Sequence, residues 1–305
     1  MIDGARSDRK VGGMQVRTSA RNCGLTGLLV ALACSTPDST PEINTPPEST
    51  AAESPTTSPP SDWVSELGDV LVVPADSDGT AMVLFPDAPS AQLIASRGVT
   101  LVGAGGDTAF TRATLVVADS QICGEASTIR FTDSVGTPWS VGLQGKRVTP
   151  LRMDSLGSVP GRDSVRLTAE LARLASSIPM DAASRFKGLP FAVLSARQLG
   201  MNGRPIVIAH LVRRLAQEAA PLEEHTLLIA EADSASTTSR RWTLAYHQRS
   251  EGSEETAEQY ELLSAVRGSA TLVLIARHRD AQSIYEVIER TPAGWVSRWH
   301  RILSC

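Results

Sequence analysis

Cysteines, aromatic residues and net charge are all scarce in this chain of 305 residues. Four cysteines are too few for a fold held together mainly by disulfides. The formal net charge of −4 shows no basic excess of the kind that binds nucleic acid, so no nucleic-acid partner is expected. No apolar run reaches the roughly 20 residues that a membrane-spanning helix needs. Hydrophobic residues still make up 42%, enough for one large core or two small ones.

The most informative apolar stretch is short and ends at a cysteine. It covers residues 24–33 and is followed by Cys34, with Arg17 and Arg21 ahead of it. A basic leader, an apolar stretch of about 7–15 residues and small residues before the cut are typical of an export signal. The sequence therefore predicts an export signal over residues 1–33, with Met14 as a possible true start.

The segment from Met14 to Cys34 resembles the signal of a bacterial lipoprotein precursor. The resemblance implies that cleavage leaves Cys34 first in the mature chain and that its sulfur carries diacylglycerol. Two acyl chains anchor a protein stably to a bilayer, so the membrane is the expected partner. Ser35 is not the aspartate of an inner-membrane retention signal, so the resemblance favours the outer membrane. A secreted protein without lipid is the alternative.

Residues 34–62 form a linker between this cysteine and the rest of the chain. Proline, serine and threonine dominate the linker, its charged residues are all acidic, and Ile43 is its only large apolar residue. Such a composition cannot bury enough apolar surface to offset the entropy lost on ordering. We therefore predict a disordered spacer ahead of a globular region over residues 63–305.

Only Cys123 and Cys305 remain for the globular region once Cys23 and Cys34 are assigned to the export segment. Two cysteines in an exported domain indicate one disulfide, which would tie the last residue to the first half of the fold. Two unrelated thiols are the alternative.

Short β-type runs separated by polar turns dominate the globular region. Asp76-Ser77-Asp78-Gly79 and Met201-Asn202-Gly203 are hairpin signals, and residues 271–303 have the pattern of a meander. Successive strands with short turns favour antiparallel sheets. We expect an α+β fold dominated by antiparallel strands, with two possible lobes over residues 63–160 and 161–305.

One helix is expected near residues 163–178. Asp163 is a capping candidate and Pro179 a stop signal. The apolar residues between them recur near the helical period and predict one buried face: Val165, Leu167, Leu171, Leu174 and Ile178.

The candidate catalytic residues are Glu218, Glu223, Glu224 and His225, which crowd a predicted connection between strands. Carboxylates with a histidine can bind zinc or perform acid–base chemistry. Their spacing matches no metal motif, so no metal is predicted, and a solvated acidic loop is the alternative. Gly103-Ala104-Gly105-Gly106 lacks the third glycine of a dinucleotide loop, and no cofactor is expected.

Trp295 and Trp299 are the candidate binding surface. Their even spacing places them on the same face of a final strand, where exposed tryptophans could bind peptide or sugar. Packing in the core is the favoured interpretation, because a chain with few aromatic residues tends to use them for packing.

Taken together, the sequence favours a membrane-anchored envelope lipoprotein. Its globular region is expected to be a non-enzymatic binding or structural module with an envelope protein or glycan as its partner. The alternative is an envelope hydrolase or metal-dependent enzyme with a site near Glu218–His225.

Overall fold

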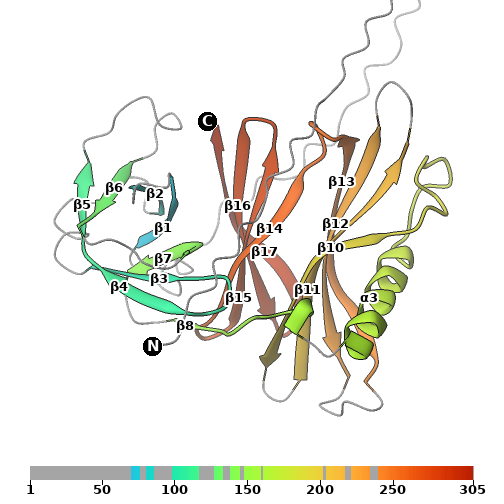
Figure 1. Ribbon diagram of the computed structural model, residues 1–305, viewed down its shortest axis with the longest axis horizontal. Helices are drawn as coiled ribbons and strands as arrows, with labels where there is room; N and C mark the ends of the chain where they lie inside the picture. Colours follow the sequence, from blue (N-terminus) through green and yellow to red (C-terminus); the bar gives the residue numbers. More distant parts are fainter. Residues whose placement is uncertain are drawn as a thin grey trace, which may run out of the picture. The chain divides into compact units, whose positions relative to one another are not determined.

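The computed structural model is antiparallel and strand-dominated, with one long helix (Figure 1). It describes residues 70–75, 80–85, 98–116, 127–132, 138–144, 148–158, 161–201, 204–216, 221–233 and 240–304, all within one compact unit. The predicted α+β class with strand dominance is confirmed. The predicted signal, linker and lipid site at Cys34 lie outside the described residues, as do Glu218 and the pair Cys123 and Cys305.

The first seven strands form one sheet, here called the N-sheet, in the order β4-β3-β7-β1-β2-β6-β5. Only Arg112 separates β4 from β5, although these strands lie at opposite edges of the sheet. Neighbouring strands are about 4.8 Å apart, so one residue cannot cross a flat sheet of this width. The sheet must curl until its edges meet. The strands are β1 (Val70–Pro74), β2 (Thr80–Phe85), β3 (Val99–Val102), β4 (Thr108–Thr111), β5 (Ala113–Val116), β6 (Thr128–Phe131) and β7 (Val141–Gln144).

Two further antiparallel sheets each consist of a four-stranded meander and a two-residue edge strand. The middle sheet has the order β17-β16-β15-β14-β8: β17 (Gly294–Ser304), β16 (Gln282–Thr291), β15 (Thr271–Arg279), β14 (Gln259–Arg267) and β8 (Thr149–Pro150). The helix-side sheet has the order β13-β12-β11-β10-β9: β13 (Trp242–Ser253), β12 (Leu222–Ala232), β11 (Arg204–Leu215), β10 (Ala192–Met201) and β9 (Asp154–Ser155).

Residues 151–153 connect β8 in the middle sheet to β9 in the helix-side sheet. The N-sheet ends at Gln144, and β8 already pairs with β14. The boundary between the N-sheet and the two meander sheets therefore falls before residue 149.

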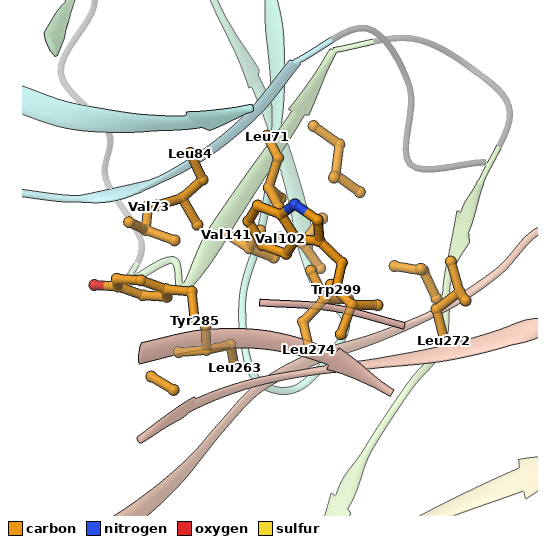
Figure 2. Close-up of a cluster of buried hydrophobic side chains, with 14 of the residues drawn as sticks. Leu71, Val73, Leu84, Val102, Val141, Leu263, Leu272, Leu274, Tyr285 and Trp299 are labelled. Atoms are coloured by element: carbon orange, nitrogen blue, oxygen red, sulfur yellow. The ribbon is translucent and has the colours of Figure 1, made fainter. Parts of the chain in front are cut away.

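Both faces of the middle sheet are buried. One face packs against the N-sheet, where Trp299 and Leu274 meet Leu71 and Leu84 (Figure 2). The other face packs against the helix-side sheet, where Ile275 and its neighbours meet residues of β11 and β12. Burial on both faces explains why β15 has a continuous apolar run over residues 272–276 and lacks clean alternation.

The helix α3 spans Gly161–Ser176, close to the predicted range, and covers the outer face of the helix-side sheet. Leu167, Leu171, Leu174 and Ile178 are buried as predicted, and the chain leaves the helix before Pro179. The prediction for Val165 is wrong, because this side chain is 71% exposed. It lies two positions before Leu167, about 200° around the helix, and therefore points away from the stripe.

Gly106 closes the tight turn between β3 and β4. Its φ is +85°, and its amide donates to the carbonyl of Gly103 at 2.9 Å. A Cβ at this position would lie 2.8 Å from the Cα of Arg152 and 2.8 Å from the carbonyl oxygen of Leu151. Both obstacles are backbone atoms of the connection between β8 and β9, so they cannot rotate away.

We expect Gly106→Ala to destabilise the protein by about 2–4 kcal/mol. Alanine is strained in the left-handed backbone conformation, and its Cβ would overpack against the backbone of residues 151–152. Gly188→Ala is the matched control, because Gly188 has a φ of +80° but nothing within 4 Å of the added Cβ. Denaturant unfolding of both variants separates the two contributions. Equal losses in the two variants would show that the approach to residues 151–152 is unimportant.

Candidate functional site

Glu223, Glu224 and His225 lie inside β12 and are 4%, 0% and 1% exposed. The prediction that they occupy a loop between strands is wrong. Arg213 and Arg214 of β11 stand directly opposite Glu224 and Glu223 in the antiparallel register. Each acidic side chain can therefore enter the interior with a basic partner on the neighbouring strand, which removes the usual penalty against burying an unpaired charge.

Alternation along β12 sends these residues to opposite faces of the helix-side sheet. Glu223 and His225 share the face of Leu227, which packs against the middle sheet. Glu224 shares the opposite face with Leu228, which packs beneath α3. The three candidates therefore form two separate polar groups, and no single cluster contains all of them.

The inner group is a line of hydrogen bonds from Arg214 to the middle sheet. Nε of Arg214 donates to Oε1 of Glu223 at 2.5 Å, and Oε2 of Glu223 lies 2.7 Å from Nε2 of His225. Nδ1 of His225 lies 2.8 Å from Nε2 of His210 on β11. The backbone of Tyr260, on β14, also hydrogen-bonds to His210. We call the side chains of Arg214, Glu223, His225 and His210 the histidine chain.

Burial and neighbouring charges decide the protonation of this chain. Burial, and to a lesser extent the charge of His225, lower the pKa of His210 from its ordinary value of 6.5 to about 4. Burial acts to raise the pKa of Glu223, but the hydrogen bonds and charges of Arg214 and His225 outweigh it, and the pKa of Glu223 is lowered. Glu223 is therefore a carboxylate, and His210 is neutral at ordinary pH.

The outer group centres on Arg213, whose side chain is 2% exposed. Nη2 of Arg213 donates to Oε2 of Glu224 at 2.6 Å. The guanidinium also lies over the rings of Phe191 and Phe186, at 4.6 and 5.7 Å from their centroids. Glu251 on β13 faces Glu224 in register, and desolvation together with the hydrogen bond to Glu224 raises the pKa of Glu251.

A third polar group, around the buried carboxylate of Glu286, lies between the two meander sheets and was not predicted. Nε2 of Gln248 donates to Oε1 of Glu286 at 2.7 Å and to the hydroxyl of Tyr246 at 2.6 Å. Arg277 pairs with Glu286 at 3.1 Å and donates to Glu258 at 3.0 Å. Gln248 and Glu286 are 38 positions apart in the sequence, and no local pattern marks them as partners.

Two hollows in the described part of the chain are lined by residues other than the three buried candidates. A cavity of about 10 Å³ lies among apolar side chains between the N-sheet and the middle sheet, and a groove of about 300 Å³ lies beside β10. Neither is lined by Glu223, Glu224 or His225. Within the described ranges, no three His, Cys, Asp or Glu side chains are arranged to hold a metal ion. In the same ranges, no helix is long and apolar enough to span a bilayer.

The expectation that Trp295 and Trp299 lie on the same face of the last strand is wrong. Both are buried, at 6% and 8% exposure. A β-bulge adds Arg298 to β17 between two residues that pair with Val287 and Ile288, and this extra residue reverses the alternation. Trp299 therefore packs against the N-sheet, whereas Trp295 faces the helix-side sheet.

Trp295 has a defined polar contact at that interface. Its indole Nε1 donates to Oε1 of Glu231 on β12 at 2.7 Å, and Arg290 donates to both oxygens of the same carboxylate. The two tryptophans are therefore packing residues, in agreement with the interpretation that the sequence favoured.

No protein-family model matches the chain, and neither the curated proteins nor the solved structures contain a match for it.

Proposed function

We propose that this protein is an exported lipoprotein whose globular region serves the cell envelope as a non-enzymatic binding or structural module. The observation that carries the proposal is the apolar stretch that ends at Cys34, directly before a proline-rich acidic linker. A lipid on Cys34 would hold the chain at a membrane, preferably the outer membrane, and the linker would let the globular region reach an envelope protein or glycan.

The geometry of the acidic strand supports a non-enzymatic role. Glu223, Glu224 and His225 would have to meet a substrate to act in a hydrolase, but all three form internal hydrogen bonds in a buried strand. Their removal is expected to unfold the protein and not to abolish a turnover. Crosslinking in intact cells tests the binding role. Reproducible recovery of the same envelope partner would support this role, and failure to recover any partner would count against it.

We expect Cys34→Ser to abolish fatty-acid attachment, because only a thiol at that position can be modified on sulfur. Bacterial cells fed a labelled fatty acid should label the wild-type chain, and its mature mass should begin at Cys34 with diacylglycerol added. Cys23→Ser is the matched control, since Cys23 lies within the leader and is removed with it. This control should label normally.

Two outcomes contradict the proposal. The first is a wild-type protein recovered from the aqueous fraction without fatty acid. The second is equal labelling of the wild type and the Cys34→Ser variant.

A further inference from the structure

One edge of the helix-side sheet is covered only in part. The short strand β9 pairs with Arg197 and Gln198 of β10, and the chain then leaves the edge in the 3₁₀ turn η2 (Leu156–Ser158). Residues 192–196 of β10 pair with β11 on one side, and on the other side no strand of the described residues pairs with them. Alternate residues of such an edge point their N–H and C=O groups outward, where they can pair with a further strand.

A groove of about 300 Å³ lies along this open edge. Leu194 of β10 lines the groove and is 49% exposed, whereas Ala196 beside it is only 7% exposed. Leu156 of η2 also lines the groove and packs partly against the core beneath α3. Among the described residues of the lining, Arg197 is the only charged one and none is aromatic. The groove therefore offers apolar contacts and open backbone groups, but no ring on which a sugar could stack.

The side of α3 that borders the groove is uncharged. Thr168 lines the groove, and Val165, three residues earlier, lies on the same side of the helix and is 71% exposed. Helix sides that face water usually carry polar or charged residues, so an exposed valine on an uncharged wall indicates a surface that a partner covers. The charged residues of α3 fall together on the opposite side, within about 100° of one another around the helix axis: Arg162, Asp163, Arg166, Glu170 and Arg173.

The strand edge lacks the usual protection against pairing. Exposed edges are commonly blocked by a charged residue or a proline, and residues 192–196 read Ala-Val-Leu-Ser-Ala. Leu194 is the extra residue of a β-bulge, since Val193 pairs with Leu211 and Ser195 pairs with His210. A bulge re-aims one side chain of an edge strand, and here it leaves an apolar side chain half exposed beside the groove.

We propose that this groove binds an extended peptide segment of a partner protein, which joins the helix-side sheet as a strand beside residues 192–196. The segment pairs with the β10 backbone where β9 leaves it, and five residues of open edge accept about 17 Å of strand. Alternate side chains of the segment point toward the uncharged wall of α3, which suits small or apolar residues. The inference rests on the proposed binding role and deepens it, because it names the chemistry of the envelope partner.

A second copy of the same edge fits less well than a single segment. In an antiparallel pair of two β10 strands centred on Leu194, residues 190–191 of one copy would lie opposite residues 197–198 of the other. The strand β9 already occupies the position beside residues 197–198, so the two copies would collide there. An acyl chain also fits less well, because it would cover the outward backbone groups without pairing them.

Random linear peptides displayed on phage test the groove, with the full chain as bait. We expect enriched peptides that alternate apolar residues and lack proline, because proline removes a backbone donor. A synthetic copy of an enriched peptide should bind the Leu194→Lys variant about tenfold or more weakly than the wild type, since lysine brings a charge to the apolar edge. Ile302→Lys is the matched control and should bind normally, because Ile302 is 55% exposed on β17, an edge strand of the other meander sheet.

Hydrogen exchange and backbone methylation identify the mode of binding. The outward amides of residues 192–196 have no partner strand among the described residues and should exchange rapidly in the free chain. The bound peptide should slow their exchange about tenfold or more and leave the amides of β17 unchanged. Methylating one alternate set of peptide nitrogens should abolish binding and methylating the other set should not, because only alternate amides of a strand face its neighbour.

Three results would overturn the proposal: no enriched peptide, equal binding to the wild type and the Leu194→Lys variant, or unchanged exchange at residues 192–196 in the complex. Soluble cell-wall glycan fragments that bind the wild type and not the Leu194→Lys variant, with no peptide bound, would assign the groove to a glycan instead. Crosslinking in intact cells separates this proposal from the broader one. If the same partner is recovered from the wild type and the Leu194→Lys variant, the binding role stands and the groove is not its site.

Discussion

Replacing Arg213 by alanine is expected to destabilise the protein by about 3–5 kcal/mol, the usual cost of removing one partner from a buried ion pair. The substitution leaves Glu224, which is 0% exposed, without its 2.6 Å hydrogen bond and beside the second carboxyl group of Glu251. It also empties the space over the rings of Phe186 and Phe191. Chemical denaturation of the wild type and the Arg213→Ala variant measures the difference in their free energies of unfolding.

The double variant Arg213→Met with Glu224→Gln is the informative control. It removes both charges and keeps most of the volume, so it should cost clearly less than the single alanine variant. Arg173→Ala on α3 is the second control, because Arg173 is exposed and its pair with Glu170 is a surface pair; no resolvable change is expected. If Arg213→Ala is at least as stable as the double variant, the burial of Glu224 does not depend on its ion pair with Arg213.

Trp299→Ala is expected to cost about 3–5 kcal/mol, the range for deleting a large buried aromatic side chain. The indole fills the space between the middle sheet and the N-sheet, among Leu71, Val141 and Leu274 (Figure 2). The cavity of about 10 Å³ beside it shows that little free volume exists there before the deletion. Thermal or denaturant unfolding measures the loss.

Ile302→Ala on the same strand is the matched control, because Ile302 is 55% exposed and should lose much less stability. Trp299→Phe should fall between the two variants, since it keeps part of the packing. Equal stabilities for Trp299→Ala and Ile302→Ala would contradict the assignment of Trp299 to the core between the two sheets.

The secondary structure could be predicted well where the pattern was local. The helix stripe of Leu167, Leu171 and Leu174 repeats at the helical period, and Pro179 stops it, so α3 was recognisable from the sequence. The meander over residues 271–303 was equally clear from its turns and apolar runs. Val165 was assigned wrongly because an apolar residue near a stripe need not lie on it.

The candidate site was recognisable only in part. Glu223, Glu224 and His225 were singled out for their chemistry, but their partners His210, Arg213 and Arg214 were not connected to them. The hairpin register of β11 and β12 pairs Arg214 with Glu223 and Arg213 with Glu224. The sequence did contain a signal for these ion pairs, because two consecutive basic residues precede two consecutive acidic residues on the two sides of one turn. The contact between His210 and Tyr260 joins different sheets and had no local signal.

Composition and period alone determined that this chain has a strand-rich body with one helix, because alternation and turn chemistry act over a few residues. Tertiary structure alone decided which side chains meet. A single extra residue in β17 reversed the faces of Trp295 and Trp299, and a register between strands turned an apparent acidic loop into buried ion pairs. Both outcomes depend on contacts between strands, and their free energy is set by burial and partners that no short stretch of sequence contains.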